Sequence, residues 1–159
     1  MHPRSTRTRS SSTPSVKAVS TLSLVNEAYS RLRASAAAYS NACRIEELCA
    51  IKAWMESFGD RLEGMAEKLQ DEGARQRRAL DATAARLYDT DVCSSPEKML
   101  REAIINQRAI VNAFALITER LDMDADLYEL VTDQHEEMSE ALIDMQELLR
   151  EYETYGQVA

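Results

Sequence analysis

The chain has 159 residues, of which 45% are hydrophobic and 29% are charged, and its formal net charge at pH 7 is −8. This length suits one domain with a core of its own, and an acidic surface excludes nucleic-acid binding over most of the molecule because phosphate is repelled. Only four glycines and three prolines are present, which is too little turn chemistry for a many-stranded fold. We therefore expect an all-α protein.

The charge is unevenly distributed along the chain. Residues 1–26 carry four basic and no acidic residues, whereas residues 91–159 carry five basic and sixteen acidic ones. Low hydrophobicity and Pro14 oppose helix formation near the N-terminus. We therefore expect residues 1–18 to be a disordered, Ser/Thr-rich basic arm and residues 19–156 to form a helical domain. The basic residues of this arm are Arg4, Arg7, Arg9 and Lys17.

Apolar residues then recur every three or four positions, which is typical of amphipathic helices with coiled-coil-like seams. The first apolar stripe begins at Leu22 and predicts a helix over about 20–42. The second begins at Leu48 and predicts a helix over about 44–71. The change of phase between the stripes fits either two helices or one bent helix.

A glycine follows the second stripe. Glycine costs a helix about 1 kcal/mol relative to alanine, so Gly73 predicts a kink or short turn at about 72–74. Apolar spacing resumes after this point and predicts a helix over about 74–90.

The clearest helix start is Pro96. Proline suits the first helical position, Ser95 can cap the helix, and Glu97 meets the positive end of the helix dipole. We expect this helix to cover about 96–121 and, after a short link, a last helix to cover about 125–154. Short links favour antiparallel neighbours, so the sequence predicts an antiparallel bundle of four to five helices.

The last helix carries carboxylates on the face opposite its apolar seam. Like charges four residues apart destabilise an isolated helix by about 0.2–0.5 kcal/mol per pair. Such a face can simply be solvated, or it can bind a basic partner, either another protein or the arm of this chain. Trp54, at the edge of the second seam, can complete the core or anchor a partner. The candidate partner-binding residues are Trp54, Asp133, Glu136, Glu137, Glu140, Asp144 and Glu147.

Residues for catalysis are scarce. The sequence has two histidines, no glycine-rich phosphate loop and no Glu-x-x-His pair of the kind found in di-metal carboxylate bundles. His135 fits a partly buried position at a helix edge better than a metal ligand. We predict no catalytic, cofactor-binding or metal-binding residue, no cofactor and no small-molecule substrate.

Cysteine usage and hydropathy bear on the compartment. Cys43, Cys49 and Cys93 form no CxxC pair and no even framework, which favours reduced thiols in the cytoplasm. No stretch of about 20 apolar residues is present, so no membrane span is expected.

These observations favour a non-enzymatic helical bundle that binds another protein, either a basic partner or a copy of itself, through a helix face. An alternative comes from the acid-free, arginine-containing start, which resembles the leaders of type III secreted bacterial effectors and organellar transit peptides. This resemblance implies a protein that is secreted or imported into an organelle, with an N-terminal targeting signal. Two weaker alternatives are nucleic-acid binding through the arm and a carboxylate–metal enzyme.

Overall fold

The computed structural model describes residues 19–81 and 95–156, and within these ranges it contains helices and no strand. It has four α-helices and one 3-10 helix: α1 (Thr21–Ala42), η1 (Glu46–Ile51), α2 (Lys52–Arg75), α3 (Pro96–Thr118) and α4 (Ala125–Tyr155). The predicted all-α bundle is therefore confirmed. The predicted arm at 1–18 lies outside the described residues.

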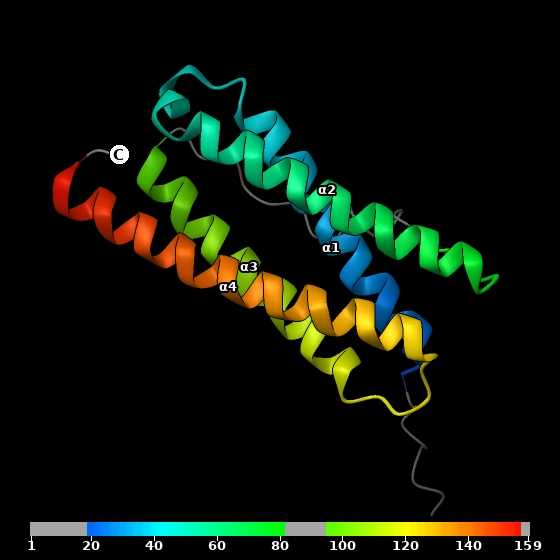
Figure 1. Ribbon diagram of the computed structural model, residues 1–159. Coiled ribbons are helices and arrows are strands. Elements are labelled where there is room, and N and C mark those ends of the chain that lie inside the picture. Colours follow the sequence, from blue (N-terminus) through cyan, green and yellow to red (C-terminus); the bar gives the residue numbers. More distant parts are fainter. Residues whose placement is uncertain (1–18, 82–94, 157–159) are drawn as a thin grey trace, which may run out of the picture.

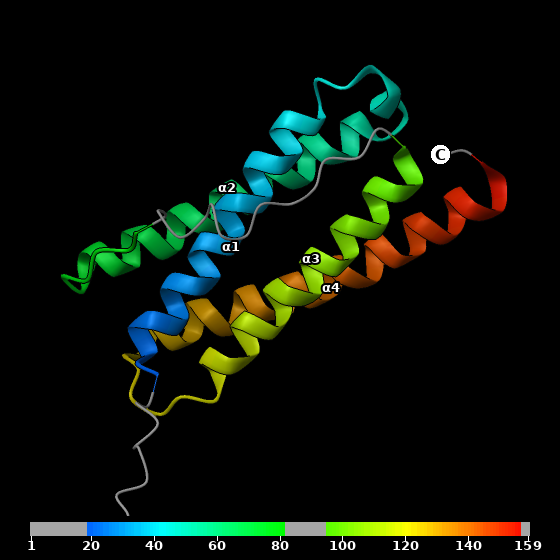
Figure 2. The same ribbon diagram turned by 180° about the vertical axis from the view of Figure 1, so that it is seen from behind.

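The helices form two antiparallel hairpins that pack against each other (Figure 1). One hairpin is α1 with α2, the other is α3 with α4, and α1 lies against α3 as well as α2. Both α2 and α3 begin at the end of the bundle where α1 ends. They therefore run in the same direction, as Figure 2 shows from behind. The two hairpins are therefore joined mainly by the packing of α1 on α3.

The junction between the hairpin helices settles the alternative left open by the sequence. The chain turns after Ala42, where the amide of Ile45 donates to the Ala42 carbonyl at 3.0 Å, so α1 and α2 are two helices. The segment predicted as the start of one long helix at 44 instead forms η1. Residues three apart lie on the same side of a 3-10 helix, and the buried Leu48 and Ile51 of η1 close this end of the core.

The predicted kink at 72–74 is wrong, because α2 continues through Gly73 and ends at Arg75. The helix is terminated by a Schellman motif, in which the next residues return hydrogen bonds to the last turn. The amide of Arg78 donates to the Gly73 carbonyl at 2.7 Å, and Arg77 takes the left-handed conformation with φ of 57°. The described part of the predicted helix at 74–90 is thus helical only to Arg75, and the rest from 82 lies outside the described residues.

Gly73 is needed because the chain folds back across it. A Cβ at this position would lie 2.7 Å from the Arg78 carbonyl oxygen and 3.3 Å from Cγ of Leu80. The returning segment then reaches α1, where the amide of Asp81 donates to Oδ1 of Asn26 at 2.7 Å. The close approach of two chain segments, rather than a break in the helix, explains the glycine.

The start of α3 agrees with the sequence and its end does not. Pro96 is the first helical residue, although the Ser95 side chain makes no capping hydrogen bond and only its carbonyl accepts from the amide of Met99 at 2.9 Å. The helix ends at Thr118 instead of 121. Leu121, the last residue of the predicted helix, therefore lies in the link and is fully exposed. Leu22 is also exposed, because Thr21 and residues 24–25 form the buried side of the first turn of α1.

Two buried glutamines connect α4 to different helices. The side-chain amide of Gln107 on α3 donates to the Met138 carbonyl at 2.9 Å, and that of Gln134 on α4 donates to the Met65 carbonyl of α2 at 3.1 Å. Polar groups at buried seam positions favour one register over others. These two bonds therefore fix the register of α4 against α3 and against α2.

Replacing Gly73 by alanine is expected to lower the free energy of unfolding by about 1–3 kcal/mol, because the added Cβ would clash with the returning chain. Gly64 is the matched control: it also lies in α2, and a Cβ there would meet no atom within 4 Å. Gly64→Ala should raise the free energy of unfolding by about 0.5–1 kcal/mol through helix propensity. Urea denaturation followed by circular dichroism measures the free energy of unfolding of both variants. Equal stabilisation by the two substitutions would contradict the close approach of the returning chain to Gly73.

Candidate functional site

The most distinctive surface of the molecule is the side of α4 that points away from the core. We define the acidic face as the seven exposed carboxylates that follow this side of the helix at intervals of three or four residues. They are Glu129, Asp133, Glu136, Glu140, Asp144, Glu147 and Glu151. At 1.5 Å per residue the acidic face is about 33 Å long.

Cations of α2 neutralise the carboxylates beside this face but not those on it. Glu137 is paired with Arg61 at 3.0 Å, and Asp126 is paired with Arg75 at 2.7 Å. The seven carboxylates of the acidic face form no ion pair with any residue of the described ranges 19–81 and 95–156. These carboxylates are therefore exposed to solvent and can interact with a molecule that approaches α4.

One apolar side chain interrupts the acidic face. Ile143 is 56% exposed and lies in the same row as Glu140 and Glu147, three residues after the first and four before the second. Exposed ion pairs contribute only about 0.2–1 kcal/mol each, whereas burying apolar area contributes about 25 cal/mol per Å². A partner that covered Ile143 would gain more than one that met the carboxylates alone.

The structure separates the residues that the sequence grouped as partner-binding. Asp133, Glu136, Glu140, Asp144 and Glu147 lie together on the acidic face, and Glu137 turns toward α2.

Trp54 is not part of that surface. It lies in the first turn of α2, half-buried, with its ring stacked on Phe58 at 5.7 Å and edge-on to Tyr39 at 5.6 Å. The structure thus places Trp54 at the edge of the core. The arm residues Arg4, Arg7, Arg9 and Lys17 lie outside the described ranges.

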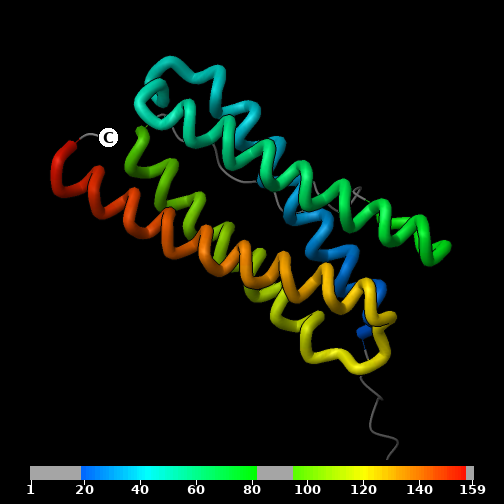
Figure 3. Tube along the Cα trace, in the orientation of Figure 1, coloured from blue at the N-terminus to red at the C-terminus, as the bar shows by residue number. Residues whose placement is uncertain are grey.

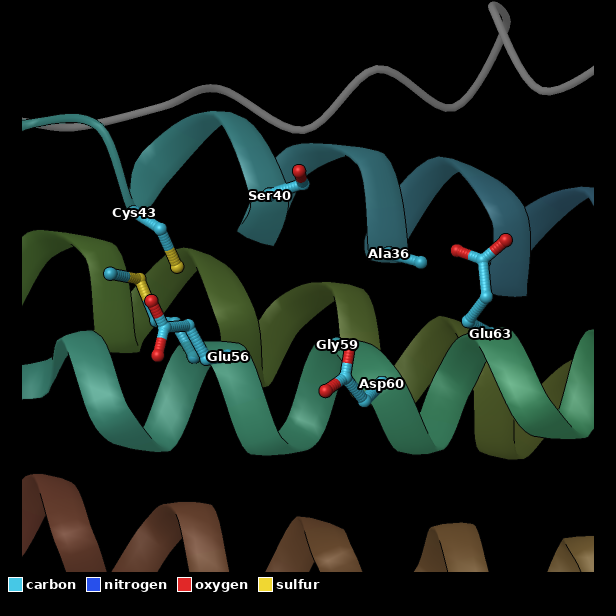
Figure 4. Close-up of a pocket in the computed structure, with 8 residues that line it drawn as sticks. Ala36, Ser40, Cys43, Glu56, Gly59, Asp60 and Glu63 are labelled. Atoms are coloured by element: carbon cyan, nitrogen blue, oxygen red, sulfur yellow. The ribbon is translucent and has the colours of Figure 1, made fainter.

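A second candidate is a polar groove of about 430 Å³ between α1 and α2, shown in Figure 4. The small residues Ala36 and Gly59 line it where the two helices approach closely, since a Cβ on Gly59 would lie 3.4 Å from Cβ of Tyr39. Two of its carboxylates already have cations: Glu56 lies 3.8 Å from Lys52, and Glu63 accepts from Arg33. The remaining polar groups that line it are Ser40, Cys43 and Asp60.

The groove lacks an activated nucleophile. Partial burial and the nearby Glu56 carboxylate raise the pKa of the Cys43 thiol, so the reactive thiolate is scarce at neutral pH. Among the described residues the histidine is His135, which lies half-buried on α4, at a helix edge as predicted, and does not line the groove. No histidine of the described residues therefore lines the groove beside the thiol.

Three carboxylates meet where α2 ends and α4 begins. Oxygens of Glu72, Asp124 and Asp126 lie within 4.8 Å of one another. Arg75 donates hydrogen bonds to Glu72 and, at 2.7 Å, to Asp126, and the hydrogen bond from Arg75 lowers the pKa of Glu72. Asp124 caps α4 by accepting from the amide of Asp126 at 2.9 Å. The cluster is thus an ion-paired contact between two helices, and no local sequence signal announced it because its members are about 50 residues apart.

The environment of Cys43 predicts an order of thiol reactivity. In a Cys93→Ser background, the exposed Cys49 should react with a disulfide dye about tenfold faster than Cys43 at neutral pH. The rate at Cys43 should keep rising with pH beyond the usual thiol range, because its pKa is raised. Single Cys→Ser variants assign the two rates, and equal rates at neutral pH would contradict the shielding of Cys43.

Repulsion along the acidic face predicts a stability effect that needs no partner. Five like-charged pairs four residues apart involve this face, at 129/133, 133/137, 136/140, 140/144 and 147/151. The variant Asp133→Asn/Glu136→Gln/Glu140→Gln/Asp144→Asn/Glu147→Gln removes all five pairs, and its free energy of unfolding should rise by about 1–2.5 kcal/mol at low salt. The gain should shrink at about 1 M salt, where charges are screened within about 3 Å. Destabilisation of this variant would show that the carboxylates have favourable contacts.

Comparisons with known proteins found no relative of this chain. No family model matches the chain, no curated protein is similar to it, and no solved structure matches its fold. None of the helices in the described part of the chain combines the length and apolar character needed to cross a membrane.

Proposed function

We propose that this protein is a non-enzymatic helical bundle that binds another protein through the acidic face of α4. The observation that carries the proposal is a row of seven exposed carboxylates that form no ion pair with the described residues, with the exposed Ile143 among them. The complementary partner is a basic amphipathic segment. Its lysines or arginines would meet the carboxylates, and one apolar side chain would cover Ile143.

A helical partner fits this geometry best. Carboxylates repeat along α4 every three or four residues, so cations at the same spacing on a second helix can meet several of them at once. Each cation also relieves repulsion between neighbouring carboxylates, which is a gain that an isolated ion pair lacks. Because the pairs are exposed, we expect fast, electrostatically steered association that weakens with salt.

Self-association through the same face is disfavoured. A second copy of α4 would place carboxylates opposite carboxylates, and like-charge juxtaposition opposes binding. If the protein self-associates, the exposed Ile105 and Leu116 on α3 offer a less acidic surface; they are 59% and 49% exposed.

The proposal is tested with a 20-residue helical peptide that carries lysines on one face and a single leucine among them. Fluorescence anisotropy should show binding that weakens as salt rises. Neutralising Asp133, Glu136, Glu140, Asp144 and Glu147 should weaken binding about tenfold or more, since four or more ion pairs are lost. Ile143→Ser should weaken it about fivefold with no change in charge.

A matched control removes five exposed carboxylates elsewhere in the bundle. The variant Glu46→Gln/Glu47→Gln/Asp60→Asn/Asp71→Asn/Glu119→Gln has the same net charge as the α4 variant, and its affinity should stay within about twofold of the wild type because only long-range screened charge is lost. Equal weakening by both variants, or no effect of Ile143→Ser, would reduce the binding to general charge attraction and contradict a defined site.

A further inference from the structure

We infer that residues 1–18, the basic arm, dock on the acidic face of α4 in the same molecule and compete with a basic partner. The competition rests on the proposed function, whereas the docking is a separate claim about this chain alone. Four features of the molecule support the docking: where the arm is attached, how far it reaches, its charge, and what surrounds its attachment point.

The arm leaves the bundle beside the start of α4. Thr21, in the first turn of α1, donates a hydrogen bond to Oδ1 of Asp122 at 2.7 Å, and Asp122 lies two residues before Asp124, the cap of α4. Figure 3 shows the beginning of α1 in blue next to the beginning of α4 in yellow. The attachment point is therefore at the end of the bundle where the acidic face begins.

The arm is long enough to follow the whole face. Eighteen residues span up to about 60 Å when extended, against about 33 Å for the acidic face. The surplus allows the chain to leave α1, reach Glu129 and continue toward Glu151 without being fully extended.

The charges of the arm and the acidic face are complementary. The arm carries Arg4, Arg7, Arg9 and Lys17 and has no acidic residue, so it has no internal partner for its cations. The acidic face, in turn, has no cation from the described residues. A docked arm would place cations between carboxylates that otherwise repel one another along α4.

The surroundings of the attachment point direct the arm toward α4. Asp122 contacts α1 at this point, and the hydrogen bond from Thr21, together with the nearby cations Arg120 and Arg78, lowers its pKa. Arg75 likewise occupies the carboxylates of Glu72 and Asp126. The first uncompensated carboxylate that the arm meets along α4 is Glu129.

We expect the docking to be reversible, because it depends on exposed ion pairs. Exposed ion pairs are individually weak and are screened by salt, but a tether gives the arm an effective concentration of about millimolar at the face. If the arm covers the face for about nine-tenths of the time, the apparent affinity for a basic partner falls about tenfold.

The docking is tested on the full chain, labelled with ¹⁵N, at low salt. The variant Arg4→Gln/Arg7→Gln/Arg9→Gln/Lys17→Gln should shift amide resonances of residues 129–151 relative to the wild type, and these differences should vanish at about 0.5 M salt. Tenfold dilution should leave the wild-type resonances unchanged. Unshifted α4 amides would overturn the inference, and a dilution-dependent shift would replace it by contact between copies.

A control variant removes four cations from the bundle instead of the arm. Arg44, Lys52, Arg77 and Lys98 are exposed, and none of them forms an ion pair with α4 in the described ranges, so Arg44→Gln/Lys52→Gln/Arg77→Gln/Lys98→Gln has the same net charge as the arm variant. Its shifts should stay near the substituted positions. Shifts on α4 equal to those of the arm variant would overturn the inference, because they would reflect net charge alone.

The lysine-rich peptide separates this inference from the proposed function. The arm variant should bind the peptide about tenfold more tightly than the wild type. Equal affinities would overturn competition by the arm while leaving the proposed function intact. Arm-dependent shifts on α4 with no peptide binding would support docking and overturn the proposed function.

Discussion

The two hairpins are joined mainly by α1, which packs on α2 within its own hairpin and on α3 of the other. Ala28, Leu32 and Ala42 are completely buried there, and the two hairpins meet over this helix. The opposite pair, α2 and α4, is held mainly by side chains: the Gln134 hydrogen bond to the Met65 carbonyl and the ion pairs Arg61–Glu137 and Arg75–Asp126. Because α1 and α3 join the hairpins, α4 lies at the outside of the bundle. One side of α4 is buried against the other helices, and the opposite side is exposed.

That arrangement explains how α4 tolerates a face of like charges. Repulsion between its carboxylates costs an isolated helix about 1–2.5 kcal/mol. Burial of large apolar side chains contributes about 1.5–3 kcal/mol each, and α4 buries Leu127, Val131, Met138 and Met145. Even after a generous discount for a compact unfolded state, burial exceeds repulsion. The core thus holds α4 in place, and the charge of its outer face is not needed for folding.

Most of the polar groups in the groove and in the carboxylate cluster already interact with neighbouring residues. The groove between α1 and α2 contains a thiol with a raised pKa, and its carboxylates at Glu56 and Glu63 already have cations. The carboxylate cluster at Glu72 is occupied by Arg75. On α4, by contrast, seven carboxylates follow one helix face over about 33 Å and form no ion pair within residues 19–81 and 95–156. Other exposed carboxylates without an ion pair, such as Asp60 and Glu119, do not form such a row.

The sequence by itself determined which side of each helix is buried, where α3 begins and which face of α4 is acidic, because helical periodicity and capping are local properties of the chain. The stripe from Leu48 to Leu69 is buried, and α3 starts at Pro96. Only the tertiary structure decided the parallel course of α2 and α3, the separation of Trp54 from the acidic face, and the ion pair that turns Glu137 toward α2. Gly73 shows the reason most clearly. The helix propensity of glycine predicted a break in the helix, but the residue is glycine because a Cβ would meet the Arg78 carbonyl and Leu80. These groups reach Gly73 only because the chain folds back.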